Sequence, residues 1–238
     1  MHQARVLRTH GLTPRQQRHS QVDERTAPRY RPPQGAAIPT EPMMDARKDR
    51  LLELLLVKAF EYRDDPPFEL AHGQTSPYYL NCKPVTLSAE GLALMGALGY
   101  EHAKHLDIVA VGGLTLGADP LACAISGHSF GRSRPLHAFV VRKEASEGGL
   151  QRWVEGDVKP GDRVAILDDV LTSGASTCQA IDRARDAGLV VEHVIALVDR
   201  EAGGLEKVRA HGVDVHVMMT LTELLARRTA ALRHAVEA

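Results

Sequence analysis

The feature that most constrains this fold is the regular alternation of short apolar runs with amphipathic stretches between residues 108 and 226. The apolar runs have the length of strands, and the stretches between them have apolar residues at helical spacing. Strands are predicted at 108–111, 137–141, 164–167, 193–198 and 213–218, and helices at 116–126, 175–187, 204–211 and 221–226. This order is typical of βαβ units. It predicts an α/β fold, with a twisted, mostly parallel sheet flanked by helices on both faces.

The chain before this alternation divides into two parts. Residues 1–42 are rich in arginine, glutamine, proline and histidine and lack apolar periodicity, so we predict a disordered leader. The rest, 43–238, is expected to be one domain. Its first part, 43–87, combines a helix with two short strand-like pieces, which predicts a small, hood-like N-terminal α+β subdomain. The core is expected over 88–226 and a C-terminal tail over 227–238.

Composition excludes several classes of protein. The net charge of −1 over 238 residues lacks the basic excess of proteins that bind nucleic acid or anionic membranes. No apolar run is long enough to cross a membrane, and no apolar signal core follows the first residues, so a cytoplasmic location is expected. Three widely spaced cysteines suggest neither a disulfide framework nor a zinc site.

The stretch VAILDDVLTSGAST, 164–177, is the strongest candidate site. An apolar strand ends in two acids, Asp168 and Asp169, and small or hydroxyl residues then lead into a helix. Small side chains let a ligand approach the backbone, amides at a helix N-terminus attract an anion, and hydroxyls such as that of Thr177 add donors. The acids suit sugar hydroxyls or a hydrated Mg²⁺ ion that keeps its waters, so no direct protein ligand to the metal is expected.

Three alternatives for this stretch fit the residues less well. A plain strand-to-helix loop would use Asp as a turn former and Ser or Thr as an N-cap, but it does not need so many small and hydroxyl residues together. A dehalogenase-type nucleophile needs an Asp-x-Asp pair. A Walker loop needs a lysine after the glycine, whereas Ala175 follows Gly174.

VAILDDVLTSGAST resembles the phosphoribosyl pyrophosphate signature of type I phosphoribosyltransferases. The resemblance implies that Asp168 and Asp169 engage the ribose hydroxyls. It implies that the following loop cradles the 5-phosphate, through Val170, Leu171, Thr172, Ser173, Gly174, Ala175 and Ser176. The stretch FELAHGQTSPYYLNCK, 68–83, is similar to the N-terminal segment of the orotate enzymes, which implies that Tyr79 and Leu80 face the base.

Three further motifs follow in the family's order. VGGLTLGADPLA, 111–122, resembles the pyrophosphate loop, and VVRKEAS, 140–146, resembles the strand entering the catalytic loop, so Arg142 and Lys143 would meet pyrophosphate. In LVDREAGG, 197–204, Arg200 would grip the orotate carboxylate, because a guanidinium binds a carboxylate through two parallel hydrogen bonds. Thr172 would also contact orotate.

The resemblance covers about 45–226. It implies an orotate phosphoribosyltransferase that uses orotate, phosphoribosyl pyrophosphate and Mg²⁺. It also implies a homodimer in which the loop bearing Lys143 reaches the partner's site.

The catalytic loop departs from the family pattern R-K-E-x-K-x-H-G, because Ser146 and Gly148 stand where lysine and histidine are usual. Two cations are missing near the leaving group, and Arg152 is another potential supplier of charge. Ala71 and His72 are smaller departures. Two alternatives therefore stay open: a phosphoribosyl pyrophosphate or nucleotide sensor without turnover, and a phosphoribosyltransferase for another base. Cys82, near the expected base pocket, is predicted to be an inert buried thiol.

Overall fold

The computed structural model describes residues 41–69, 75–144 and 153–237, which all lie within one compact unit of the chain, 32–238. Of the leader predicted over 1–42, only the last two residues are described. They begin helix α1 (Glu41–Lys58). Ala71, His72, Ser146, Gly148 and Arg152 lie outside the described residues.

The centre of the domain is a six-stranded sheet with the strand order β10-β9-β8-β5-β6-β7. The strands are β5 (Ala110–Leu114), β6 (His137–Val141), β7 (Val154–Gly156), β8 (Arg163–Leu171), β9 (Val190–Asp199) and β10 (Asp214–Thr220). Every neighbouring pair is parallel except β6 with the edge strand β7. The predicted mostly parallel sheet is therefore confirmed.

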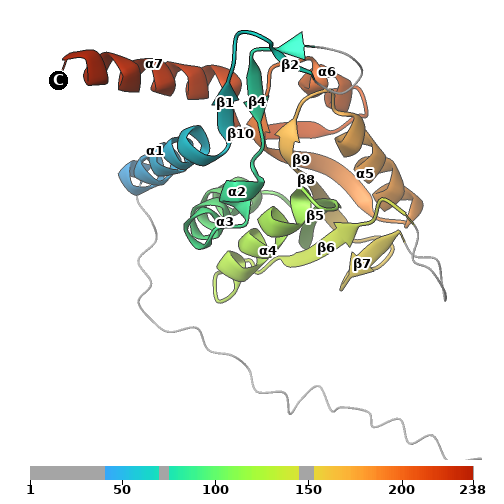
Figure 1. Ribbon diagram of the computed structural model, residues 1–238. Helices are drawn as coiled ribbons and strands as arrows, with labels where there is room; N and C mark the ends of the chain where they lie inside the picture. Colours follow the sequence, from blue (N-terminus) through green and yellow to red (C-terminus); the bar gives the residue numbers. More distant parts are fainter. Residues whose placement is uncertain (1–40, 70–74, 145–152, 238) are drawn as a thin grey trace, which may run out of the picture. The chain divides into compact units, whose positions relative to one another are not determined.

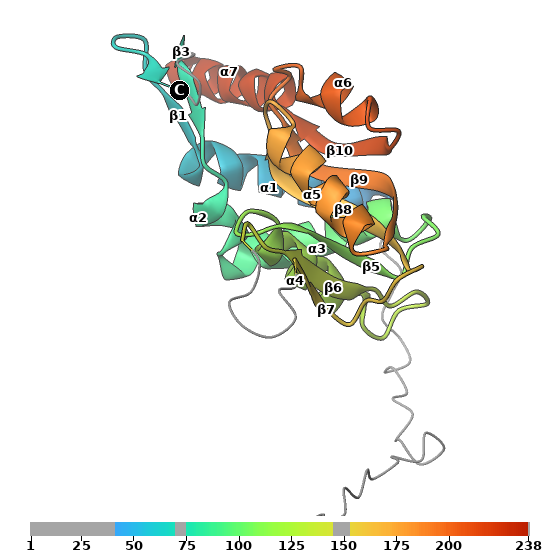
Figure 2. The same ribbon diagram turned by 90° about the vertical axis from the view of Figure 1, so that its right-hand side faces the viewer.

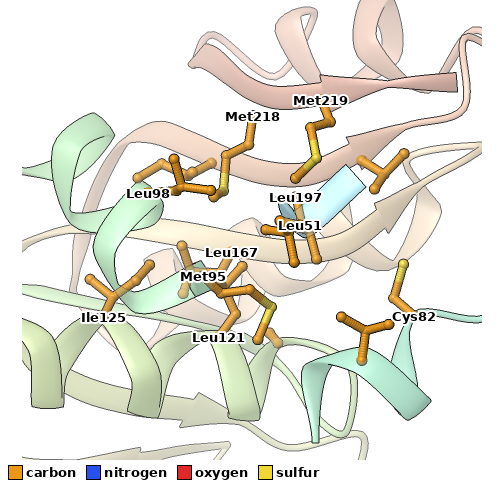
Figure 3. Packing of buried hydrophobic residues seen from close by; sticks show 14 of the residues in the cluster. Leu51, Cys82, Met95, Leu98, Leu121, Ile125, Leu167, Leu197, Met218 and Met219 are labelled. Atoms are coloured by element: carbon orange, nitrogen blue, oxygen red, sulfur yellow. The ribbon is translucent and has the colours of Figure 1, made fainter. Parts of the chain in front are cut away.

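Helices cover both faces of this sheet (Figures 1 and 2). On one face, α3 (Ala89–Ala103) and α4 (Ala118–Ser129) pack together with α1. Their apolar side chains form one core cluster with the sheet, and Figure 3 shows part of it, including Leu51, Met95, Leu98, Leu121, Ile125, Leu167 and Leu197. On the other face, α5 (Ala175–Asp186) and α6 (Gly204–Arg209) cover a second cluster around Phe139, Ile166, Ile181 and Val208.

The predicted N-terminal elements are present. After α1, β1 (Phe60–Tyr62) pairs antiparallel with β4 (Tyr78–Leu80), and β2 (Phe68–Glu69) pairs with β3 (Thr75–Ser76). Helix α2 (Lys83–Thr86) then leads to α3, and the hydroxyl of Ser88 caps α3 by accepting from the Gly91 amide at 3.1 Å. Leu51 and Leu55 of α1 belong to the core cluster that contains Met95 of α3, so α1 is part of the main core.

Several elements end later than predicted, and β8 and α7 extend furthest. Strand β8 continues past residue 167 through both acids to Leu171, because it stays paired with β9 up to Leu171 and Asp199. Helix α7 (Leu221–Glu237) continues past residue 226 through most of the expected tail. In this added part of α7, Arg227 donates 3.0 Å hydrogen bonds to Asp49 and Glu53 of α1. These charged contacts join α7 to α1.

Strand β7 is an addition to the prediction, and its three residues are too few to show an alternating pattern. Among the described helices, none has the length and apolar character needed to cross a bilayer.

Candidate active site

The site lies where the order of the sheet reverses. From β5 the chain builds outward to β6 on one side, then returns to place β8, β9 and β10 on the other side. In open parallel sheets, ligands bind outside the carboxyl ends of the strands at such a reversal. Here β5 pairs with β8 only as far as Gly113 and Leu167, so β8 continues alone on that side through Asp168 and Asp169.

Asp168 is held in a fixed position by hydroxyl groups from the first turn of α5. Its Oδ2 accepts hydrogen bonds from the Thr177 hydroxyl and, at 3.3 Å, from the Ser176 hydroxyl. The Val170 amide donates to Oδ1 at 3.4 Å. Asp168 is only 9% exposed, and burial raises its pKa to about 6, helped by the neighbouring charge of Asp169 and opposed by these hydrogen bonds. Thr177, expected as a ligand donor, instead orients an acid.

Asp169 faces the loop between β5 and α4. A Cβ on Gly117 would lie 2.3 Å from its Oδ1, so only glycine lets the loop pass this close to the carboxylate. Burial raises the pKa of Asp169, and the positive charge of Lys83 lowers it. The same loop leads into α4, and its Thr115 hydroxyl donates a hydrogen bond of 2.6 Å to Asp119 in the first turn of that helix.

A cavity of about 210 Å³ joins these parts. Both acids and Ser176 line it, together with Thr177 and the loop 114–117, and two cations, Lys83 and Lys143, complete its wall. The predicted residues Asp168, Asp169, Lys143 and Ser176 are therefore brought together. Lys143 lines the cavity of its own chain, although the resemblance implied that its loop reaches the partner's site.

Lys83 is a site residue that was not predicted from the sequence. It occupies the first position of α2, far from the acids in the chain. A single lysine after a short strand carries no pattern of its own. The one usable signal was its position at the end of the family-like stretch 68–83.

Arg142 has a different environment from its neighbour Lys143. Its side-chain Nε donates to the Glu144 carbonyl at 3.1 Å, and its backbone amide donates to the Trp153 carbonyl at 2.9 Å. The predicted contact of Arg142 with pyrophosphate stays a prediction.

The loop after the acids leads into α5 as the sequence predicts. Gly174 has a φ of +71°, which glycine adopts without strain, and a Cβ there would lie only 2.9 Å from the Gly204 carbonyl oxygen. Both the backbone conformation and the lack of space therefore favour glycine. Ser173, Ala175 and Ser176 are exposed around this buried glycine. Because the first amides of a helix lack partners within the helix, the start of α5 presents donors to the outside.

Arg200 follows β9 at the same edge of the sheet. Its amide donates to the Leu171 carbonyl at 2.9 Å, which fixes it beside the end of β8. Its Nη2 donates to the Tyr78 carbonyl of β4 at 3.2 Å, while its buried Nε has no hydrogen-bond partner among the described residues. Burial lowers the pKa of Arg200, but a guanidinium keeps its charge, so this group is suited to an anionic ligand.

The side chains of Tyr79 and Leu80 do not face the same space. They are successive residues of β4, whose side chains point to opposite faces. Leu80 is 8% exposed within the core cluster, whereas Tyr79 is 39% exposed and stacks on Phe68 with ring centroids 5.4 Å apart. The two side chains therefore cannot both face one base. Cys82 is fully buried, and burial raises the pKa of its thiol, as expected of an inert cysteine.

The described residues contain no group of three or more His, Cys, Asp or Glu side chains able to hold a metal ion. Asp168 and Asp169 fit a different arrangement. Burial raises the pKa of both carboxyls because it disfavours their negative charge, and a nearby cation would offset this cost. The pair is therefore suited to a hydrated Mg²⁺ ion, which keeps several waters and takes few protein ligands.

The parallel sheet reverses its strand order, and two acids and the glycine-turned start of α5 lie at this reversal, which agrees with the type I phosphoribosyltransferase fold predicted from the sequence. No protein-family model matches the chain. Orotate phosphoribosyltransferase of Aquifex aeolicus is 42% identical over 183 residues, 77% of this chain and 100% of the relative. That of Sorangium cellulosum is 44% identical over 183 residues, covering 76% and 94%.

Among solved structures, orotate phosphoribosyltransferase of Mycobacterium tuberculosis in complex with 5-phospho-alpha-D-ribosyl 1-diphosphate is 34% identical. The match covers 75% of this chain and 98% of that one, with a TM-score of 0.63. The chain belongs to the orotate phosphoribosyltransferase family. The family predicted from the five motifs and the fold predicted from the alternation of strands and helices are confirmed.

Proposed function

We propose that this protein transfers the 5-phosphoribosyl group from phosphoribosyl pyrophosphate to orotate, giving orotidine 5'-monophosphate and pyrophosphate in pyrimidine (UMP) biosynthesis. The observation that carries the proposal is the cavity in which Asp168 and Asp169 face Lys83 and Lys143. It offers acids for the hydroxyls of a sugar and cations for a leaving pyrophosphate within one space. The mycobacterial relative, solved with the same donor, supports this assignment.

The reaction needs positioning and charge neutralisation. As the bond from the anomeric carbon to pyrophosphate breaks, the ribose becomes oxocarbenium-like and negative charge grows on the leaving group. Lys83 and Lys143 are suited to neutralise that charge, an effect that acts mainly in the transition state. The two acids would hold the ribose, and the exposed start of α5 would hold the 5-phosphate through its amides and hydroxyls.

Arg200 supports orotate as the acceptor. Its Nη2 is fixed by the Tyr78 carbonyl, and its buried Nε is free of partners among the described residues. An unpaired buried donor is costly, so a ligand carboxylate there would be favoured. In this proposal Thr172 also contacts orotate, and the backbone of β4 around Tyr79 and Leu80 borders the base.

Mg²⁺ belongs to the proposal as a hydrated ion carried by the donor. Asp168 and Asp169 are the residues that would hold it through water, and when bound it would supply positive charge to the pyrophosphate. A homodimer and a cytoplasmic location, implied by the resemblance and the composition, are also proposed.

The test is the consumption of orotate, followed by its ultraviolet absorbance, with phosphoribosyl pyrophosphate and Mg²⁺. We expect consumption that requires both. Parallel reactions with adenine and uracil separate the alternatives that the altered loop leaves open. If the protein binds the donor in a calorimeter without consuming any base, it is a sensor. If it consumes another base and spares orotate, the acceptor is wrongly assigned.

A further inference from the structure

The stem of the catalytic loop is held by a residue that no motif identifies. The loop leaves the sheet after Val141 of β6 and re-enters at Val154 of β7, and these two residues form the last pair of the β6–β7 ladder. Beyond them, the Arg142 amide donates to the Trp153 carbonyl at 2.9 Å. Lys143, the cation that lines the active cavity, follows directly.

Arg183 of α5 contacts both sides of this stem. Its Nη1 donates a hydrogen bond to the Arg142 carbonyl, and its guanidinium carbon lies 4.2 Å from the centre of the Trp153 ring. Stacking of a guanidinium on an indole is attractive, and a charged donor to a carbonyl adds to it. One side chain therefore ties the outgoing backbone to the returning indole.

Helix α5 also carries the groups that orient the acids. Ser176, which donates to Asp168, and Arg183 are seven positions apart, so they lie on the same face about two turns apart. The helix thus contacts the acidic side of the cavity with its first turn and the stem of the Lys143 segment with its last.

We propose that Arg183 is a positioning residue, which acts through the Arg142–Trp153 stem to hold Lys143 against the cavity. The proposal rests on the proposed function. Arg183 contacts no reacting group itself. A misplacement of a charged group by about 1 Å can lower the rate on the order of a hundredfold. Arg183 can therefore affect the rate through the position of Lys143.

Arg185 provides the matched control. It lies in the same last turn of α5 and also binds carbonyls, those of His211 at 3.0 Å and Val191 at 2.8 Å, neither of which belongs to the stem. Arg185→Ala thus removes an equivalent cation from the same helix end. Arg183→Lys keeps the charge of Arg183 but loses the planar group that stacks.

The experiment compares the wild type with Arg183→Ala, Arg183→Lys and Arg185→Ala. Arg183→Ala is expected to lower kcat by roughly ten- to a hundredfold. The KM for orotate should stay within about twofold, because Arg200 is untouched. Arg183→Lys should recover only part of kcat, and Arg185→Ala should keep it. Emission from Trp153, the chain's single tryptophan, should change only in the two Arg183 variants.

The inference is overturned if Arg183→Ala keeps the wild-type kcat, or if Arg185→Ala loses as much. Should Arg183→Ala fail to fold, Arg183→Lys decides in its place, with an unchanged kcat counting against the inference. If the wild type shows no turnover, the proposed function fails and the affinity for inorganic pyrophosphate becomes the test. An affinity for pyrophosphate that is about tenfold lower in Arg183→Ala but unchanged in Arg185→Ala would then support the inference. Equal affinities in the two variants would overturn it.

Discussion

Asp168 is the residue at which function and stability are expected to conflict. Burial raises its pKa to about 6 from an ordinary value near 3.8. The folded state therefore binds the proton more tightly than the unfolded state. Its contribution to stability is complete below about pH 4 and is lost as the pH rises through about 6. At neutral pH the fold carries the buried charge of Asp168, which forms hydrogen bonds but no ion pair with the described residues.

Asp168→Asn should therefore make the free protein more stable at pH 7, by about 2 kcal/mol, while lowering kcat/KM by at least about a hundredfold. Denaturant unfolding at pH 7 and pH 4 measures the first effect, which should vanish at the lower pH. Asp182→Asn, on the exposed side of α5, is the control. A variant less stable than the wild type at pH 7 would contradict the assigned charge.

Arg200 gives a second prediction at this scale. Arg200→Lys removes the buried Nε and should raise the KM for orotate by about ten- to a hundredfold, because hydrogen bonds to charged groups are worth about 1.5–3 kcal/mol. The affinity for phosphoribosyl pyrophosphate should not change. Steady-state kinetics and calorimetry measure the two, with the exposed Arg209→Lys as control. A lower affinity for phosphoribosyl pyrophosphate with an unchanged KM for orotate would mean that Arg200 binds the donor and not orotate.

The start of α5 is the element on which the proposed phosphate cradle depends. Gly174→Ala should destabilise the fold by about 1–2 kcal/mol, because its φ of +71° is unfavourable for a side chain. Gly127→Ala, within α4, has nothing within 4 Å of the new Cβ and should be neutral or slightly stabilising. Thermal unfolding of both variants is the measurement. Equal melting temperatures would mean that the turn does not need glycine.

The catalytic loop offers a gain-of-function prediction. Restoring the two family cations with Ser146→Lys and Gly148→His should raise kcat by about tenfold or more, because each would neutralise charge on the leaving pyrophosphate. The control pair Ser146→Gln and Gly148→Asn adds size without charge. A measurable wild-type rate that the cations leave unchanged would show that the loop has been wrongly interpreted.

The sequence predicted the elements better than their ends. Strand β6 is found at His137–Val141 as predicted, because its apolar run is flanked by polar residues. The predicted end of β8 was wrong because acids usually end a strand, whereas Asp168 pairs with Ala196 of β9 and the pairing continues beyond Asp169 to Leu171. Lys83 and the Thr177–Asp168 contact depend on turns that bring distant residues together, and Arg183 is one arginine among many until its contacts with the stem are known.

At the scale of the whole molecule, the arrangement of the cavity leads to a prediction about subunits. Lys143 and both acids line one cavity of a single chain. In a homodimer, mixing Lys143→Ala subunits with Asp169→Asn subunits should therefore restore no activity, since each cavity of a mixed dimer still lacks one group. Refolding the two variants together and assaying orotate consumption measures this. Recovered activity would mean that Lys143 serves the partner's site.

The central claim is that Asp168, Asp169 and the start of α5 together hold an activated, phosphorylated sugar. A crystal structure with phosphoribosyl pyrophosphate and Mg²⁺ tests it most directly. We expect the ribose at the two carboxylates, the 5-phosphate at the amides that follow Ser173, and the pyrophosphate between Lys83 and Lys143. A donor bound elsewhere, with this cavity empty, would contradict the claim.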